Sequence, residues 1–215
     1  MRFQDGRRRA GAGTAASPGS GPDPRGDADP WEALRAEIVT CTKCPLHASR
    51  THAVVYRGGR NPRVVFVGEA PGAEEDRVGL PFVGRSGRRL DAAVASLELD
   101  AEAYGVLNLI KCRPPRNRFD PAAARTCRPY LDRQLDLLRP RFLVTLGAHA
   151  LAALDPEAPR ILRCAGRPRR SAGRELFPLI HPAAALRSTA LSRRWDHDLR
   201  ALDRWLSGAE RRGAR

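Results

Sequence analysis

Residues 64–84 read VVFVGEAPGAEEDRVGLPFVG, and this stretch decides the fold. It opens with a continuous apolar run, which is typical of a strand buried on both faces of a parallel sheet. A turn rich in Gly and Pro follows the run, and the chain is then expected to continue into a helix. Ligands bind at such strand-to-helix turns in open α/β sheets. The stretch therefore predicts an α/β fold with a candidate site at the end of its strand.

Three later apolar runs predict further strands, at residues 106–110, 142–146 and 176–180. The segments between the runs have helical spacing, as at Leu90 and Val94, which lie one turn apart. Strands that alternate with helices favour a parallel sheet. We therefore predict a single α/β domain with a central, mainly parallel four-stranded sheet and helices on both faces.

Composition predicts the boundaries of this domain. Residues 1–29 are rich in Gly, Ala, Pro, Arg and Ser and contain almost no large apolar residue, which indicates a disordered basic tail. An N-cap and a first-turn Pro in Asp29-Pro30-Trp31 predict the first helix of a domain over residues 30–207. The last helix is expected from Ser192 to about Leu206. Residues 208–215 are expected to form a second disordered basic tail.

The charge of the chain indicates its partner. The sequence has 38 Lys and Arg against 24 Asp and Glu, a formal net charge of +14. Almost all of the cations are Arg, whose planar donor fork suits phosphate. Nucleic acid is the leading partner. The alternative is a solvated basic surface that reflects Arg-rich codon usage.

The sequence also predicts the compartment. It has no run of about 18 apolar residues, so no membrane span is expected. The N-terminal segment lacks the apolar region of a secretory signal. We expect a cytoplasmic, nucleoid-associated protein that acts as a monomer. In the cytosol, five cysteines indicate metal or redox chemistry rather than disulfides.

Four of the cysteines form a candidate metal site. Cys41 and Cys44 are a C-x2-C pair, and Cys112 and Cys127 follow at wide spacing. A zinc ribbon normally brings a second C-x2-C pair, whereas a four-thiolate iron–sulfur cluster tolerates spread ligands. Zinc and ordinary buried thiols remain alternatives. The fifth cysteine, Cys164, is expected to be a small buried apolar residue.

Three segments carry a resemblance to a known family. These are GEAPG at 68–72 with PFVGRSG at 81–87, NLIKCRPP at 108–115 and HPAAALR at 181–187. Together they resemble family 4 uracil-DNA glycosylases, over roughly residues 31–206. The resemblance implies an enzyme that hydrolytically removes uracil from DNA and starts base-excision repair. It also implies a structural [4Fe–4S] cluster on the four cysteines.

The uracil pocket follows from the residues together with the resemblance. An enzyme that acts on a base in duplex DNA must rotate the nucleotide out and read its exposed edge. Phe82 offers a ring face for stacking, and Gly68 and Ala70 let the first loop approach the base. Asn108 interrupts an apolar strand, so it either caps a local backbone group or reads a ligand. The resemblance assigns it to uracil, and Glu75 to the C5 edge, where it would exclude a methyl group.

Two residues are candidates for catalysis. His181 follows a strand and precedes Pro182, which directs it into a loop. By resemblance it donates to uracil O2 and stabilises the departing base. Glu69 is expected to orient water or to stabilise the oxocarbenium-like sugar, because Ala70 stands where family 1 relatives place an Asp. The other four histidines show no comparable setting: His47, His52, His149 and His197.

DNA is expected to bind around the mouth of the pocket. Leu186 is placed to wedge into the space that the rotated base leaves. The predicted phosphate contacts are Arg85, Lys111, Arg113 and Arg187, with Arg167, Arg169 and Arg170 on a nearby basic loop.

Two alternatives within or near this family remain. The X-type relative traps its product covalently with a His in an inserted basic loop, but no His lies between Cys112 and Cys127. A non-catalytic nucleic-acid-binding module would need no carboxylate beside an anion, so Glu69, Asn108 and His181 argue against it. Added activity on hypoxanthine or xanthine stays open.

Overall fold

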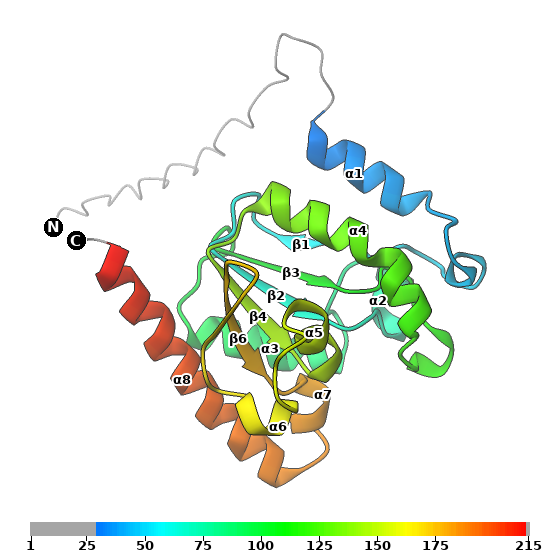
Figure 1. The fold of residues 1–215 in the computed structure, drawn as a ribbon. Helices are drawn as coiled ribbons and strands as arrows, with labels where there is room; N and C mark the ends of the chain where they lie inside the picture. The colour runs from blue at the N-terminus through cyan, green and yellow to red at the C-terminus, as the bar shows by residue number, and fades with distance from the viewer. Residues whose placement is uncertain (1–28, 214–215) are drawn as a thin grey trace, which may run out of the picture.

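The computed structural model describes residues 29–213 (Figure 1). Residues 1–28 of the tail predicted for residues 1–29, and residues 214–215 of the tail predicted for residues 208–215, lie outside the described residues. Helix α1 (Pro30–Val39) begins as the sequence predicts, because the Asp29 side chain accepts a hydrogen bond from the Trp31 amide at 2.9 Å. The N-cap and the Pro at the first turn together define this start.

The sheet has six strands in the order β1-β3-β2-β4-β6-β5. Their bounds are β1 Arg57–Gly58, β2 Val64–Gly68, β3 Tyr104–Asn108, β4 Phe142–Leu146, β5 Arg169–Ser171 and β6 Arg174–Leu179. The four central strands are parallel, and both edge strands are antiparallel to their neighbours. The α/β fold is confirmed, but the prediction of a four-stranded sheet was wrong because the sheet is mixed and six-stranded.

The two missed strands lie at the edges of the sheet. β1 has two residues and β5 has three, and neither is fully buried. Strands this short contain no apolar alternation, and they exist only because their backbones pair with a longer neighbour. The antiparallel edges extend a parallel core without changing which strand ends meet at the candidate site.

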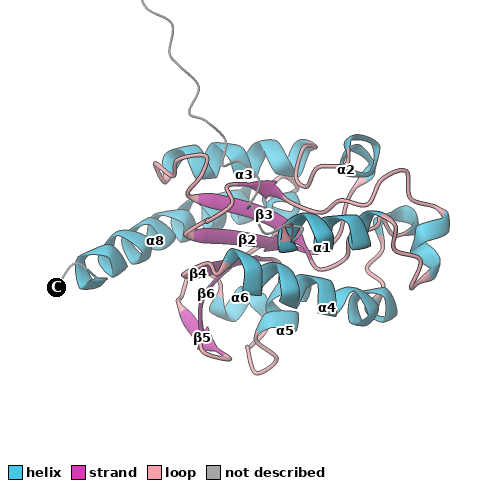
Figure 2. Cartoon of the chain, turned by 90° about the horizontal axis from the view of Figure 1, so that it is seen from above, coloured by secondary structure: helices cyan, strands magenta, loops and turns pink. Residues whose placement is uncertain are grey.

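Helices cover both faces of the sheet, as predicted (Figure 2). The remaining helices are α2 Ala73–Val78, α3 Arg85–Ser96, α4 Pro121–Leu138, α5 Ala148–Leu154, α6 Ile161–Cys164, α7 Pro182–Ala185 and α8 Thr189–Gly213, with 3-10 turns at Pro45–Ala48 and Pro115–Asn117. Helices α2, α5 and α7 directly follow β2, β4 and β6. Their first turns therefore lie at the carboxyl edge of the parallel strands.

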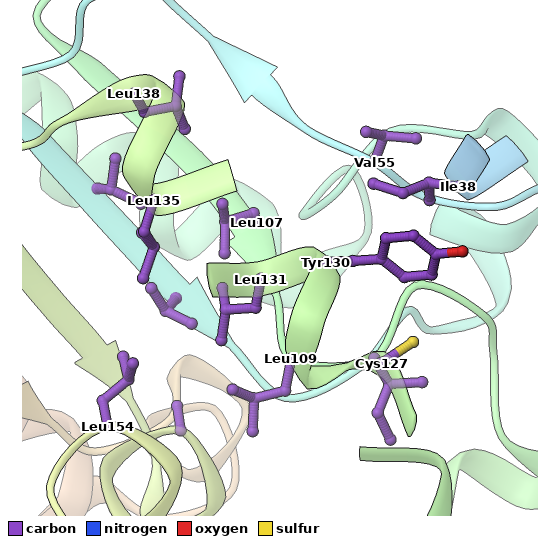
Figure 3. Close-up of a cluster of buried hydrophobic side chains, with 14 of the residues drawn as sticks. Ile38, Val55, Leu107, Leu109, Cys127, Tyr130, Leu131, Leu135, Leu138 and Leu154 are labelled. Carbon is purple, nitrogen blue, oxygen red and sulfur yellow. The ribbon is translucent and has the colours of Figure 1, made fainter. Parts of the chain in front are cut away.

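Side chains of β2 alternate between two separate cores. Val65 and Val67 pack with α1, α4 and α5, whereas Val64 and Phe66 pack with α3 and α8. Alternation of this kind is the reason that a parallel strand needs apolar residues at every position. Figure 3 shows the first core, in which Leu131 and its neighbours on α4 lie toward β3.

The last helix extends beyond its predicted end. We expected it to stop near Leu206, but α8 runs from Thr189 to Gly213. Ala209 is 3% exposed, and its carbonyl accepts from Arg141 at 2.8 Å. The helix therefore continues past residue 207, where the sequence predicts the end of the domain, and Ala209 packs against the rest of the fold. No helix within residues 29–213 is long and apolar enough to cross a membrane.

Burial along α4 gives a test of the first core. Leu131 is fully buried, whereas Leu137 on the same helix is 38% exposed. Leu131→Ala should lower the free energy of unfolding by about 2–5 kcal/mol, because it removes buried area and leaves a cavity. Leu137→Ala should change it by less than about 0.5 kcal/mol. Urea denaturation measures both, and equal losses would contradict this packing.

Candidate active site

A cleft of about 520 Å³ opens at the carboxyl edge of the parallel strands. Its walls come from the loops that follow β2, β3 and β6. They are formed by residues 69–75, Phe82, residues 84–86, Pro114, Asn117, His181, residues 183–184 and Arg187. The cleft therefore lies where the sequence predicts a site, at the end of β2, which is the first strand that the sequence predicts.

Asn108 ends β3 beside the cleft and is 1% exposed. Neither its amide nitrogen nor its amide oxygen has a hydrogen-bond partner among the described residues. Leaving such an amide unpaired in the interior costs about 1–3 kcal/mol. The sequence left two roles open for Asn108, a cap on a local backbone group and contact with a ligand. The geometry disfavours the cap, because the Asn108 amide keeps both its donor and its acceptor for a ligand.

Gly68 lies between this amide and an aromatic ring. A Cβ at Gly68 would lie 2.4 Å from Asn108 Oδ1 and 2.5 Å from Phe82 Cε2. Real side chains do not make contacts this short, so only glycine allows the ring and the amide to approach the same backbone atom. Gly68, Phe82 and Asn108 thus form one pocket, although 40 positions separate the first from the last.

Phe82 is held in an uncommon backbone conformation. Its φ is 55°, in the left-handed region that bulky residues rarely adopt. The α3 helix approaches it closely, because a Cβ at Gly87 would lie 1.8 Å from the Phe82 carbonyl oxygen. The ring is 5% exposed and lies 5.8 Å from the His181 ring, with 34° between their planes.

Glu75 lines the cleft and also organises its loop. One carboxylate oxygen accepts from the Val83 and Gly84 amides at 3.0 and 2.8 Å, and the other accepts from the Gly72 amide at 3.1 Å. Three bonds from backbone donors to a carboxylate are strong. They join the first turn of α2 to the segment that carries Phe82. This clamp was not foreseen, and contact with the C5 edge of uracil remains a prediction.

His181 precedes α7 with a defined tautomer. Its Nδ1 accepts from the Ala183 amide at 3.1 Å, so the proton of the neutral ring lies on Nε2. Burial lowers the pKa of His181, while Glu69 opposes this shift and Arg187 adds to it. The ring is therefore neutral at pH 7 and can donate one hydrogen bond from Nε2.

Glu69 has a partner that the sequence did not reveal. Its Oε2 accepts from His149 Nδ1 at 2.6 Å, and the His149 ring stacks on Phe119 with centroids 3.8 Å apart. The expectation that His149 has no special setting was therefore wrong. Its place two residues after Gly147, at the carboxyl edge of β4, was the signal that could have identified it.

Most of the predicted DNA contacts lie near the cleft mouth. Arg85 and Arg187 line it and are exposed, and Leu186 is 41% exposed. Arg113 donates to Asn117 Oδ1 at 2.8 Å, and Asn117 lines the cleft. Of the basic loop, Arg167 and Arg170 are exposed, whereas Arg169 is paired with Asp155.

The structure corrects the assignment of Lys111. This side chain is 1% exposed, and its Nζ donates to the Asn108 carbonyl at 2.6 Å. Burial lowers the pKa of Lys111 to about 8. A side chain enclosed in this way does not reach a phosphate at the surface. Lys111 instead supports the backbone of Asn108.

Four of the cysteines surround a second, small cavity, which lies beside α1 and α4. They are Cys41, Cys44, Cys112 and Cys127. Arg50 donates to Cys112 Sγ at 3.1 Å, and burial raises the pKa of the Cys112 and Cys127 thiols. Within residues 29–213, no three His, Cys, Asp or Glu side chains are gathered closely enough for a single metal ion. Cys164 lies elsewhere, on α6, and is buried at 4% exposure as expected.

These features define a class of protein. At the carboxyl edge of its parallel central strands, the α/β sheet carries a buried amide, an aromatic ring and a neutral His, which is a site suited to a planar polar base. The chain belongs to the uracil-DNA glycosylase superfamily, whose family model matches residues 55–203.

Individual relatives place the chain within this superfamily. The type-4 uracil-DNA glycosylase of Sulfurisphaera tokodaii is 36% identical over 185 residues, which cover 81% of this chain and 84% of the relative. Those of Thermotoga maritima and Archaeoglobus fulgidus are 38% and 37% identical, covering 73% and 77% of this chain and 83% and 88% of the relatives. The resemblance to family 4 is confirmed.

The state of His181 can be measured directly. Nitrogen-15 NMR of the imidazole should show the Nε2–H tautomer at pH 7 and a titration midpoint below the ordinary 6.5. Because the unfolded chain then binds the proton more readily, His181 should make the free energy of unfolding fall as pH drops below about 6.5. An Nδ1–H tautomer or a raised midpoint would exclude the arrangement described above.

Proposed function

We propose that this protein removes uracil from DNA by hydrolysing the N-glycosidic bond of a nucleotide rotated into the cleft. The observation that carries the proposal is the buried, unpartnered amide of Asn108. Its oxygen can accept from uracil N3–H while its nitrogen donates to O4. Cytosine presents a donor and an acceptor in the opposite order, so an amide held in this orientation mismatches it.

The rest of the pocket fits a flat base. Phe82 offers a ring face for stacking, and glycine at position 68 leaves space between that ring and the amide. The backbone of Ala70 forms part of the wall. We propose that Glu75, fixed by three amides, borders the C5 edge and leaves no room for the methyl group of thymine.

We propose that His181 and Glu69 act on the reacting atoms. The bond from C1′ to uracil N1 breaks, and its electron pair leaves on the base. The Nε2–H of His181 donates to uracil O2 as negative charge develops there, which favours the transition state over the ground state. The Glu69 carboxylate stabilises the positive sugar or orients the water that adds to C1′, and the proton of this water balances the charge of the uracil anion.

Arginines at the cleft mouth are proposed to hold the phosphates on either side of the rotated nucleotide. Arg85 and Arg187 line the cleft, Arg113 is bonded to its wall residue Asn117, and the formal charge of +14 agrees with a polyanionic partner. Leu186 is exposed beside Arg187 and would fill the vacated place in the stack. All residues proposed to act come from one chain, so we propose that it works as a monomer on cytoplasmic, nucleoid DNA.

We propose that the four cysteines around the small cavity bind a structural [4Fe–4S] cluster. Four thiols that face one cavity without converging on a point suit a cluster, since each thiolate there has its own iron atom. Arg50 supplies a donor to a sulfur. Such a cluster would add cross-links between the segment after α1, helix α4 and the segment after β3, and hydrolysis requires no electron from it.

The proposed activity is tested with an oligonucleotide that contains one uracil, followed by hot alkali. Cleavage at the uracil position indicates excision. A heat-stable adduct would indicate the X-type reaction, and a mobility shift without cleavage would indicate a binding module. Parallel substrates with cytosine, thymine and hypoxanthine define the specificity.

Asn108→Asp tests the reading of the base. The carboxylate cannot donate to O4, so the single-turnover rate on uracil should fall by about 10- to 100-fold, the effect of losing a hydrogen bond in a buried site. Discrimination against cytosine should weaken. Asn61→Asp is the matched control, because Asn61 is exposed and precedes the amino end of β2. Unchanged uracil kinetics in Asn108→Asp would refute the role.

Metal analysis tests the cluster. Protein purified without oxygen should be brown and contain about four iron atoms per chain. Cys127→Ser should lower the iron content, whereas Cys164→Ser, which changes a buried cysteine on α6, should not. Zinc in place of iron would overturn the assignment.

A further inference from the structure

Glu69 and His149 meet across 80 positions of the sequence. Glu69 follows β2, and His149 lies in the first turn of α5 after β4, which pairs with β2 in the sheet. The distance from His149 Nδ1 to Glu69 Oε2 is 2.6 Å. A carboxylate can only accept, so the proton of this bond lies on Nδ1. His149 therefore donates this hydrogen bond, and the Glu69 carboxylate accepts it.

The His149 ring is itself held in place. It stacks on Phe119 with centroids 3.8 Å apart and only 10° between the planes. Phe119 directly precedes the N-cap residue of α4 and packs against the first core. The imidazole is thus fixed on one face by an aromatic ring and at one edge by the carboxylate.

The backbone on either side of this contact is anchored too. The Glu69 carbonyl accepts from the Ile110 amide at 3.0 Å, and the Gly147 amide donates to the Leu179 carbonyl at 2.8 Å. A Cβ at Gly147 would lie 3.1 Å from His181 Cβ. The loop that carries His149 therefore touches the segment that carries His181, and both lie at the edge where Glu69 faces the cleft.

We propose that His149 is a positioning residue that fixes the Glu69 carboxylate in one orientation toward the reacting sugar. This inference deepens the proposed function and rests on it. The Glu69 side chain is 30% exposed at the cleft, so without a partner it would occupy several rotamers. Catalysis by charge or by water orientation depends on placement within a fraction of an ångström. The His149 ring, which stacks on Phe119, supplies that placement from outside the cleft.

The test compares His149→Ala with His149→Asn in the full-length, cluster-containing protein. The side-chain nitrogen of Asn can occupy nearly the position of Nδ1, so it can donate to Glu69 without the ring. His149→Ala should lower the single-turnover rate of uracil excision about tenfold or more, the size expected for one bond to a charged group. Its Kd for the same DNA should stay within about twofold, because His149 does not line the cleft. His149→Asn should recover most of the rate, and Phe119→Leu should show a smaller loss.

A double variant decides whether His149 acts through Glu69. If it does, Glu69→Gln with His149→Ala should be no slower than Glu69→Gln alone, whereas independent roles would give losses that multiply. His197→Ala is the matched control, because it removes a 67% exposed imidazole on α8. Thermal unfolding of each variant reports folding, and the Asn and Leu variants carry the test if His149→Ala is not folded.

The failures of the two proposals are distinguishable. If the wild-type protein does not excise uracil, the proposed function fails. If Glu69→Gln keeps the wild-type rate, the catalytic role of Glu69 fails. If Glu69→Gln is slow while His149→Ala matches wild type, or if the losses multiply, the positioning role of His149 is overturned and uracil excision stands.

Discussion

The parallel pairing of β2 with β3 is the constraint on which the cleft depends. Its register sets Gly68 beside Asn108, and the absence of a side chain at Gly68 leaves the space in which the amide and the Phe82 ring meet. The buried amide costs about 1–3 kcal/mol while it has no partner. The neighbouring strand β2 is buried at every position and tolerates this cost, so the pocket is formed before any base enters it.

The segment that carries Phe82 has a strained backbone that nearby hydrogen bonds stabilise. Phe82 has a left-handed backbone, which costs about 1–3 kcal/mol. Glu75 accepts from the amides of Gly72, Val83 and Gly84, and each such bond contributes about 1.5–3 kcal/mol. The bonds outweigh the strain, so the ring stays aligned with the amide. The Glu75 carboxylate therefore both lines the cleft and fixes the backbone next to Phe82.

The sequence predicts what depends on local pattern and misses what depends on partners. Apolar runs located the four parallel strands, but two-residue β1 and three-residue β5 have no pattern of their own. Lys111 was assigned to the surface because charge usually lies there, whereas the Asn108 carbonyl, three residues earlier, accepts its hydrogen bond in the interior. His149 was passed over because its partner lies 80 positions earlier. Sequence motifs predict which residues lie at the ends of strands. Which of those side chains contact one another depends on tertiary packing, so it is known only from the structure.

The span from Asn108 to Cys112 runs from beside the cleft to the small cavity that the four cysteines line. At one end is the amide proposed to read the base, and at the other is a cysteine that accepts from Arg50. Between them, the Lys111 Nζ donates to the Asn108 carbonyl, and the Lys111 carbonyl accepts from the Val54 amide at 2.7 Å. Because the span is short and its backbone is held by these hydrogen bonds, a group that fixes the position of Cys112 also restrains the backbone of Asn108. This coupling gives the four cysteines a reason to lie beside the base pocket of a hydrolase, whose reaction transfers no electrons.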